Sequence, residues 1–175
     1  IWIPLHDAAN DDDERKVLTY LDGLVDPADR PRREVFVGQA GEALAFFRRC
    51  GALRYTARAV APDYHPELAG ASQTGRVLDV ETFDGRKLGP RLHDLRPPLP
   101  SHLVFGGMMV NRADVQTLRG FGRNIGATWR TFGLLARYLR DRVAGWGRGT
   151  RLVVGSSLVA QLASEGIAYV PFFPL

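Results

Sequence analysis

The chain has 175 residues, of which 45% are hydrophobic and 24% charged, and its formal net charge is +4. This length allows one domain with a sizeable core, and the balance of residues is typical of a globular protein and excludes a disordered one. A single cysteine, Cys50, excludes an intrachain disulfide, and no run approaches the roughly 18 apolar residues of a membrane-spanning helix. The positive charge comes almost entirely from arginine, which favours carboxylate and phosphate partners without requiring a nucleic acid.

The two ends of the sequence are apolar. The chain starts with Ile1-Trp2-Ile3-Pro4, without a charged-then-apolar leader, and stops after the apolar run 169–175. Both ends resemble cuts through buried structure, so we expect residues 1–175 to be a single partial domain, an internal segment of a larger protein. Because the sequence contains no signal peptide, we expect a cytoplasmic location.

Two helices are predicted in the first third of the chain. The acidic residues of Asp11–Glu14 suit the positive end of a helix dipole, and apolar residues follow at helical spacing as far as Val25. The prolines of Pro27–Pro31 end this helix, and Arg32–Arg49 predicts a second one, after which Cys50 is expected to pack as a small hydrophobic side chain. The acidic run could instead bind calcium, but the glycine of a calcium loop is missing, so helix capping is favoured.

Two strands are predicted in the middle of the chain. Leu53–Val60 is rich in aromatic and alternating residues, and Arg76–Phe83 alternates apolar with polar residues. Between them, Ala61–Gly75 is rich in proline, glycine and serine and predicts a loop. The prolines of Asp84–Pro100 predict an ordered surface connection.

The longest helical pattern covers Ala113–Val143. Four glycines weaken this helix and leave open its division into two: Gly120, Gly122, Gly126 and Gly133. After a glycine-rich turn at Gly145–Gly149, the sequence predicts a strand at Arg151–Val154, a helix at Ser156–Ser164 and a last strand at Ile167–Phe173. Together these elements predict an α+β fold with helices packed on a small sheet.

Three common kinds of site find little support. The glycines of Gly120–Gly126 and Gly145–Gly149 lack the preceding strand that delivers a dinucleotide-binding turn to pyrophosphate, although the second cluster could pack beside a cofactor. The Gly-x-Ser-x-Gly turn of many hydrolases is missing, and the four histidines are too far apart for metal-ligand spacing. We therefore expect no metal site and no dinucleotide fingerprint in the chain.

The loop Pro62–Gly70 carries the best candidate for chemistry. Tyr64 stands between Pro62-Asp63 and His65, so a rigid loop would hold its phenol at a defined point. A phenol titrates near pH 10, so it needs help from a neighbour or a buried cavity to act as a base. By itself, this pattern also fits a loop tyrosine that packs as an aromatic residue.

Several motifs in this order resemble the 3-ketosteroid dehydrogenases, flavin-dependent oxidoreductases related to fumarate reductase. Residues 1–4 are similar to that family's tryptophan-x-proline segment, and Pro62-Asp63-Tyr64 followed by Gly75-Arg76 matches its Pro-Asp-Tyr and Gly-Arg pattern. Residues 148–162 are similar to its glycine turn and following helix. The resemblance covers about Ile1–Leu99 and Gly147–Val170.

The resemblance implies that the chain is part of a two-domain α/β flavoprotein and contains an incomplete FAD-binding domain. The whole enzyme would desaturate a carbon–carbon bond next to a ketone of a steroid-like substrate, with hydride transfer to FAD. By motif position, Tyr64 is the candidate catalytic residue that assists the base, and Tyr64 and His65 are candidate substrate-binding residues. The candidate cofactor-binding residues are Ile1, Trp2, Pro4, Gly149 and Gly155. The base itself would lie outside this chain, so we expect the isolated segment to be inactive.

Two alternatives stay open. One is a fumarate- or succinate-type FAD oxidoreductase that acts on another substrate. The other is a non-catalytic, basic amphipathic module that contacts membranes through residues 112–151, where nine arginines accompany two aspartates. Such a surface also suits a nucleic-acid backbone, but we expect no nucleic-acid partner, and an ordinary solvated face would explain it too. The face opposite the arginines carries Leu118, Phe121, Ile125, Trp129, Phe132 and Leu139.

Overall fold

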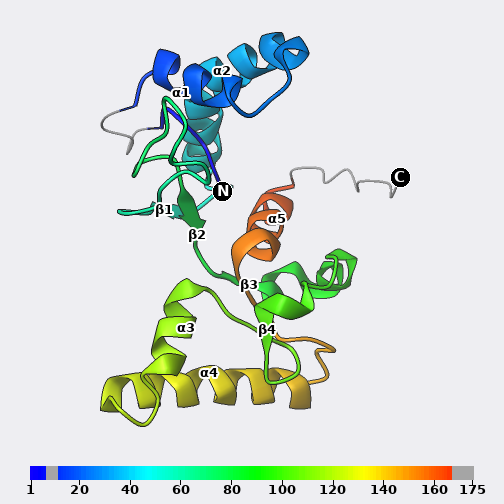
Figure 1. The fold of residues 1–175 in the computed structure, drawn as a ribbon. Helices are drawn as coiled ribbons and strands as arrows, with labels where there is room; N and C mark the ends of the chain where they lie inside the picture. The colour runs from blue at the N-terminus through cyan, green and yellow to red at the C-terminus, as the bar shows by residue number, and fades with distance from the viewer. Residues whose placement is uncertain (7–11, 167–175) are drawn as a thin grey trace. The chain divides into compact units, whose positions relative to one another are not determined.

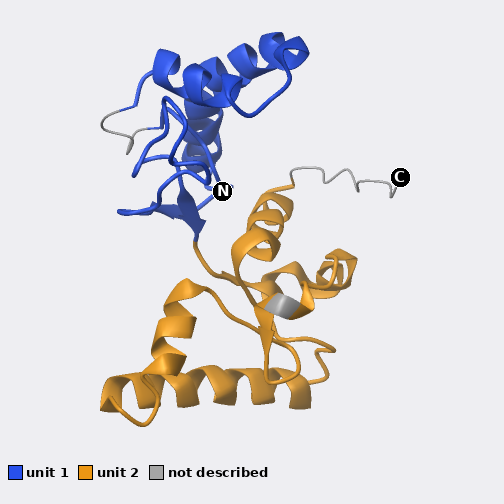
Figure 2. Cartoon of the chain, viewed as in Figure 1, with its two compact units in different colours: residues 1–80 blue, residues 81–175 orange. Residues whose placement is uncertain are grey.

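A computed structural model describes residues 1–6 and 12–166 of the chain, which divide into two compact units (Figures 1 and 2). The first unit contains the described residues up to Val80, and the second contains those from Glu81 onwards. The predicted strand at Ile167–Phe173 lies outside the described residues. Within the described part, every sheet is a short antiparallel pair of strands, and helices make up much of the rest, which confirms the α+β class.

The first unit packs two helices with one pair of strands. Its elements are α1 (Glu14–Asp22), the 3-10 turn η1 (Pro27–Asp29), α2 (Arg30–Arg49), β1 (Tyr55–Ala57) and β2 (Leu78–Val80). Helix α1 packs on α2, and Thr56 of β1 lies opposite Asp79 of β2. The core of this unit includes the buried side chains of Val17, Tyr20, Val37, Leu44, Leu53 and Leu78.

Local signals explain the helix boundaries in this unit. The side chain of Asp13 caps α1 by accepting a hydrogen bond from the Lys16 backbone nitrogen at 2.8 Å, which confirms the predicted acidic start. Pro31 lies in the first turn of α2, where its missing N–H costs nothing, so the helix begins two residues before the predicted Arg32. The prediction for Cys50 is wrong, because it caps the exposed C-terminal end of α2 and is itself exposed.

The second unit carries the remaining elements. They are β3 (Phe83–Asp84), η2 (Gly85–Asp94), η3 (Pro100–His102), β4 (Leu103–Val104), β5 (Met108–Met109), α3 (Arg112–Arg119), α4 (Ile125–Val143), β6 (Arg151–Leu152) and α5 (Val154–Ser164). Strand β3 pairs with β6, and β4 pairs with β5. Helix α5 packs on η2 and on the β3–β6 pair. The resulting core contains Phe83, Leu88, Leu92, Leu95, Met109, Leu152, Val153, Ala160 and Ala163.

The segment predicted as a surface connection, Asp84–Pro100, is instead part of this core. It folds into the 3-10 helix η2, which is kinked at Gly89, where φ is +55°. Leu88, Leu92 and Leu95 recur every three or four residues and are buried against α5 and β6. The prolines in this segment suggested a surface loop and hid the helical spacing of its leucines. The prediction that the segment lies at the surface was therefore wrong.

The other predicted elements exist with different limits. The strand predicted at Leu53–Val60 shrinks to β1, and the one predicted at Arg76–Phe83 divides into β2 and β3, which belong to different units. The long helix divides into α3 and α4, as its glycines allowed, and Gly122 provides the positive φ of +73° that the connecting turn requires. The predicted helix Ser156–Ser164 is confirmed as α5.

Candidate functional site

Tyr64 lies at the surface of the first unit. Its side chain is 94% exposed, on the loop between β1 and β2. The next residue, His65, is also exposed; its ring nitrogen lies 2.9 Å from Glu67, and its backbone nitrogen donates to the Tyr20 hydroxyl at 3.3 Å. The structure therefore gives Tyr64 no packing role within the first unit and leaves its hydroxyl accessible.

The residue before Tyr64 is buried in a charged network that we call the Arg76 clamp, formed by Trp2, Asp12, Asp63 and Arg76. Arg76 is fully buried and donates to Asp63 at 2.7 Å, and to Asp12 at 2.6 and 2.8 Å. Asp63 also accepts the Trp2 indole N–H at 2.7 Å. Each partner in the clamp satisfies a charge or polar group that would otherwise be buried without compensation.

The charge of Arg76 is stabilised within this network. Burial acts to lower the pKa of the Arg76 guanidinium, but hydrogen bonds and charges from Asp12 and Asp63 outweigh burial and raise the pKa overall. The guanidinium also lies 5.8 Å from the ring centroid of Trp2 and 5.5 Å from that of Tyr20, within the range of cation–π contacts. Arg76 is therefore a permanent positive charge at the centre of the first unit.

The loop that presents Tyr64 is closed by its own backbone. The Ala61 nitrogen donates to Gln73 at 3.1 Å, and the Asp63 nitrogen donates to Ser72 at 2.9 Å. Gly70 has a φ of +79°, and a Cβ at this position would lie 2.3 Å from the carbonyl oxygen of Lys16. Only glycine fits this close approach of the loop to α1.

The first residues of the chain are integrated into the same unit. Ile1 exchanges backbone hydrogen bonds with Leu78, and the Ile3 nitrogen donates to the Arg76 carbonyl oxygen, so this segment runs antiparallel to the start of β2 and the residues before it. The Trp2 ring stacks on Phe36 with a centroid distance of 6.3 Å, and Pro4 is buried. Ile1, Trp2 and Pro4 were selected from the sequence for a cofactor. In the structure Ile1 pairs through its backbone and Trp2 and Pro4 pack within the unit, and the cofactor contact stays a prediction.

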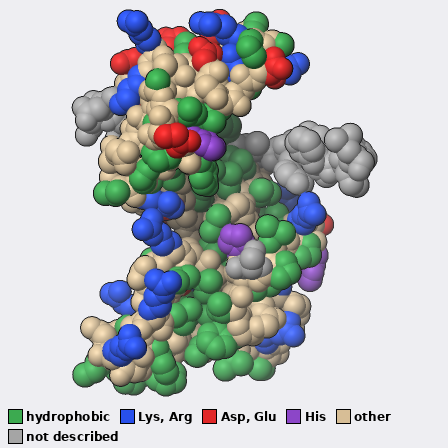
Figure 3. Space-filling view, viewed as in Figure 1, with side chains coloured by type: hydrophobic (Ala, Val, Ile, Leu, Met, Phe, Trp, Pro, Cys, Tyr) green, Lys and Arg blue, Asp and Glu red, His purple; other side chains and the backbone are tan. Residues whose placement is uncertain are grey.

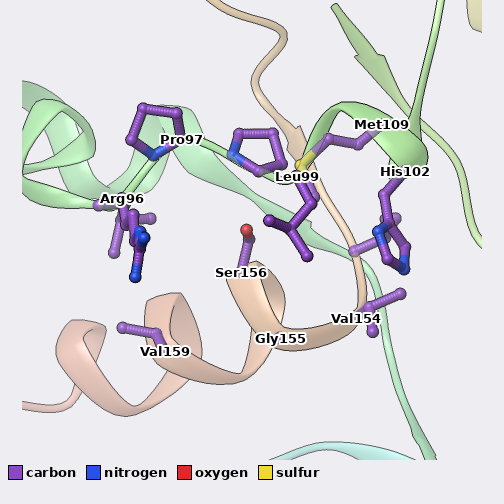
Figure 4. A pocket seen from close by; sticks show the side chains of 12 residues that line it. Arg96, Pro97, Leu99, His102, Met109, Val154, Gly155, Ser156 and Val159 are labelled. Atoms are coloured by element: carbon purple, nitrogen blue, oxygen red, sulfur yellow. The ribbon is translucent and has the colours of Figure 1, made fainter.

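The second unit contains a pocket of about 350 Å³ beside the start of α5. Figure 4 shows Pro97 and Leu99 on one side and Ser156 and Val159 on the other. Most of its wall is apolar, and Arg96 and His102 supply polar groups. The volume lies within the roughly 300–1,000 Å³ range of small-molecule sites. The full lining is Leu95, Arg96, Pro97, Pro98, Leu99, His102, Met109, Val153, Val154, Gly155, Ser156 and Val159.

Gly155 is the sequence-predicted residue that this pocket contains. It lies in the first turn of α5, and no atom lies within 4 Å of the position that a Cβ would take. The first N–H groups of a helix have no intrahelical acceptor, and Val153 at the N-cap has no side-chain group that could accept from them. The apolar pocket therefore lies beside the first turn of α5, whose N-cap side chain accepts no hydrogen bond.

Gly149, the other predicted cofactor residue of this unit, is buried. A Cβ at Gly149 would lie 3.2 Å from the ring of Tyr138, so the glycine lets this ring pack closely. Nearby, Arg148 donates to the carbonyl oxygen of Leu95 at 3.0 Å, and burial lowers the pKa of Arg148. The sequence did not predict that Leu95–Leu99 forms one wall of the pocket beside α5, because the prolines in this segment were interpreted as part of a surface loop.

Helix α4 leaves five of its large apolar side chains exposed. Ile125, Trp129, Phe132, Leu139 and Val143 are between 52% and 90% exposed. In Figure 3, hydrophobic and basic side chains lie next to one another over the part of the second unit that Figure 1 assigns to α3 and α4. We call these five residues the α4 apolar face.

Some of the arginines that the sequence predicted to form a basic surface have internal partners. Arg151 forms an ion pair with Asp114 at 2.7 Å, and Arg137 forms one with Asp84 at 3.2 Å. The side chains of Arg123 and Arg130 are exposed. The basic surface beside the α4 apolar face is therefore smaller than the sequence suggested.

The acidic run near the start of the chain has structural partners. Asp12 pairs with Arg76 and Asp13 caps α1, which accounts for both carboxylates without calcium. Among residues 1–6 and 12–166, no three His, Cys, Asp or Glu side chains gather as a metal site would require. In the same part of the chain, no helix has both the length and the apolar character needed to cross a membrane.

Comparison with known proteins relates the chain to one group of enzymes. No family model matches. The 3-oxosteroid 1-dehydrogenase of Mycolicibacterium smegmatis is 31% identical over 93% of the chain, and that of Comamonas testosteroni is 27% identical over 93%. The 4-oxocyclohex-2-ene-1-carboxylate 5-dehydrogenase of Sinomonas cyclohexanicum is 30% identical over 79%. The chain is homologous to a segment of the 3-oxosteroid 1-dehydrogenases.

A solved structure agrees with this relationship at the level of the fold. The 3-ketosteroid Δ1-dehydrogenase of Sterolibacterium denitrificans, in complex with 1,4-androstadiene-3,17-dione, matches 94% of the chain with a TM-score of 0.71 and 23% identity. The resemblance predicted from the sequence motifs is thereby confirmed. The chain spans 28% and 29% of the length of the two steroid dehydrogenases and 30% of the solved structure.

Proposed function

We propose that this chain is part of a flavin-dependent oxidoreductase that desaturates a carbon–carbon bond next to the ketone of a steroid-like substrate. The observation that carries the proposal is the 31% identity, over 93% of the chain, to an enzyme named for this reaction on 3-oxosteroids. We favour a ketone substrate over fumarate or succinate because the named relatives are dehydrogenases of oxo compounds.

In this proposal, Tyr64 assists proton removal from the carbon next to the ketone. Its exposed hydroxyl can donate to or accept from a substrate or a second catalytic group, and the buried Asp63 fixes its backbone. Since a free phenol titrates near 10, the base that takes the proton would be supplied by a part of the enzyme outside this chain. His65 would contact the substrate from the same loop.

The start of α5 is suited to part of a flavin. Gly155 opens onto an apolar pocket next to backbone N–H groups, which fits a ring system that is largely apolar and carries carbonyl oxygens. When bound, FAD would supply the acceptor for the hydride. Gly155 would let the ring approach the helix closely, and Gly149 with Tyr138 would support the neighbouring turn. Ile1, Trp2 and Pro4 stay candidate cofactor-binding residues of the first unit, on the strength of the motif resemblance.

Flavin binding can be tested on the full-length protein that contains this segment. We expect that protein to purify with the visible absorption of bound flavin, and residues 1–175 alone to bind flavin weakly. Gly155→Leu places a side chain in the pocket and should lower the flavin content, whereas Gly147→Leu, at an exposed glycine, should leave it unchanged. A folded, colourless full-length protein would contradict the proposal.

A second proposal is that the α4 apolar face contacts a membrane surface. Exposed aromatic and aliphatic side chains, flanked by Arg123 and Arg130, combine apolar burial with attraction to anionic headgroups. A steroid-like substrate partitions into membranes, so peripheral contact would bring an enzyme in the cytoplasm to its substrate.

Vesicle sedimentation tests this second proposal. Binding of the full-length protein to anionic vesicles should fall with added salt and should weaken roughly tenfold or more in Arg123→Glu/Arg130→Glu, since each basic residue near the surface contributes about 1 kcal/mol. Arg32→Glu, at an exposed site in the first unit, is the matched control. If binding does not depend on lipid charge, the membrane proposal is wrong. It is also wrong if another part of the protein or a second copy covers the α4 apolar face.

A further inference from the structure

We infer that Arg76 and Asp63 act together as positioning residues for Tyr64, an inference that rests on the role proposed above for this tyrosine. The guanidinium of Arg76 and the carboxylate of Asp63 meet at 2.7 Å, and both side chains are completely buried. Asp63 immediately precedes Tyr64 in the chain. The ion pair thus fixes the backbone from which the tyrosine projects.

Arg76 holds the Tyr64 loop at two points. Its Nη1 donates to Asp63, and its Nη2 donates to the carbonyl oxygen of Gly70 at 3.0 Å. The segment 64–69 lies between these two points. Because the Tyr64 side chain is exposed, its own contacts do not orient it, and its position depends on how firmly the loop backbone is held.

Asp63 connects this guanidinium to other parts of the loop. Its Oδ2 accepts from the Ser72 nitrogen at 2.9 Å, and its Oδ1 accepts from the Trp2 indole at 2.7 Å. One carboxylate therefore joins the two arms of the loop and the first segment of the chain. A group held this way keeps its geometry before substrate arrives, which removes an ordering cost from the reaction.

Arginine is suited to this task and lysine is not. The planar guanidinium donates at the same time to Asp12, Asp63 and Gly70, in directions fixed by its fork. A lysine ammonium preserves the buried positive charge but cannot reproduce this geometry. Arg76→Lys should therefore loosen the loop while retaining a counter-charge for the two carboxylates.

Asp12 provides the matched control. Its carboxylate is buried and pairs with the same guanidinium at 2.6 Å, but it lies outside the Tyr64 loop. Asp12→Asn and Asp63→Asn each remove one negative charge from Arg76. A general loss of stability should be similar in the two variants, whereas an effect on Tyr64 should be confined to Asp63→Asn.

The experiment combines hydrogen exchange with single-turnover flavin reduction by a 3-keto steroid in the full-length enzyme. In Arg76→Lys and Asp63→Asn, the amides of Ala61, Asp63 and Ser72 should exchange at least tenfold faster, and flavin reduction should slow by roughly 10- to 100-fold at unchanged flavin content. Asp12→Asn should leave both rates within about threefold of wild type. In a Tyr64→Phe background, Arg76→Lys should cause little further slowing, because the group it positions is already gone.

The outcomes separate the inference from the function it rests on. If Tyr64→Phe is slow but Arg76→Lys and Asp63→Asn reduce flavin at the wild-type rate, the positioning role is wrong. The positioning role is also wrong if Asp12→Asn slows flavin reduction as much as Asp63→Asn does. It is wrong too if the double variant Arg76→Lys/Tyr64→Phe is slowed by the product of the two single effects. If Tyr64→Phe itself reduces flavin at the wild-type rate, the catalytic role proposed for Tyr64 fails, and the positioning role fails with it.

Discussion

Replacing Tyr64 with phenylalanine should lower kcat of the full-length enzyme by roughly 10- to 10⁴-fold, because a general acid or base typically contributes about 10²- to 10⁴-fold and Tyr64 is proposed only to assist the base. Phenylalanine keeps the ring and removes the hydroxyl. Because the Tyr64 side chain is 94% exposed in the first unit, the change should leave the stability of that unit almost unaltered. Steady-state assays with a 3-keto steroid, together with thermal denaturation and flavin absorption, measure all three quantities.

Tyr55→Phe is the control for this prediction. It removes a phenol hydroxyl from β1 of the same unit, at a position that has no proposed contact with substrate. A fall in kcat for both variants, or normal turnover per folded molecule in Tyr64→Phe, would mean that the assignment of Tyr64 is wrong.

Replacing Arg76 with alanine should destabilise the protein by about 3–5 kcal/mol, the cost typical of removing one partner from a buried ion pair. The substitution leaves Asp12 and Asp63, whose side chains are at most 2% exposed, without their counter-charge. It also removes the donor to the Gly70 carbonyl and the cation that faces Trp2 and Tyr20. Urea denaturation, followed by tryptophan fluorescence, should show a lower midpoint of unfolding.

Arg32→Ala gives the comparison for this stability measurement. Arg32 pairs with Asp29 at 3.2 Å, but its side chain is 88% exposed, so solvent screens the pair and the midpoint should hardly move. Similar small shifts for the two variants would show that the Arg76 clamp does not hold the first unit together.

The sequence alone predicted the elements whose signals are local. The acidic cap at Asp13, the end of α1 before Pro27 and the helix that became α5 all depend on residues within a few positions of each other. The same holds for the loop that carries Tyr64. Its prolines and glycines indicated irregular backbone, and the motif in it pointed to the family that the comparisons confirmed.

Features that join distant parts of the chain could not be predicted in this way. The contact between Arg76 and Asp12 spans 64 positions, and that between Trp2 and Asp63 spans 61. Trp2 was selected for a cofactor and Arg76 was noted only as part of the Gly-Arg motif, yet both belong to an internal network whose geometry exists only in the folded unit. Likewise, no local pattern marked Leu95–Leu99 as one wall of a pocket opposite Gly155.

The sequence also left open which side of the α4 helix is buried. Amphipathic spacing identified two faces, but the face that packs inward contains Thr131 and Asp141, and the α4 apolar face points outward. Asp141 accepts hydrogen bonds from the nitrogen and the hydroxyl of Thr150, which accounts for its burial. This buried polar contact between α4 and the turn before β6 lies on the inward side of the helix, and hydrophobic periodicity does not report such contacts.

Anaerobic mixing of the oxidised full-length protein with a 3-keto steroid tests the central claim most directly. If this chain is part of a flavin-dependent steroid dehydrogenase, the flavin absorption should bleach in a single turnover as the desaturated ketone appears in equal amount. The bleaching should be strongly slowed in Tyr64→Phe at unchanged flavin content. A protein that binds flavin but is not bleached by any 3-keto steroid would contradict the account.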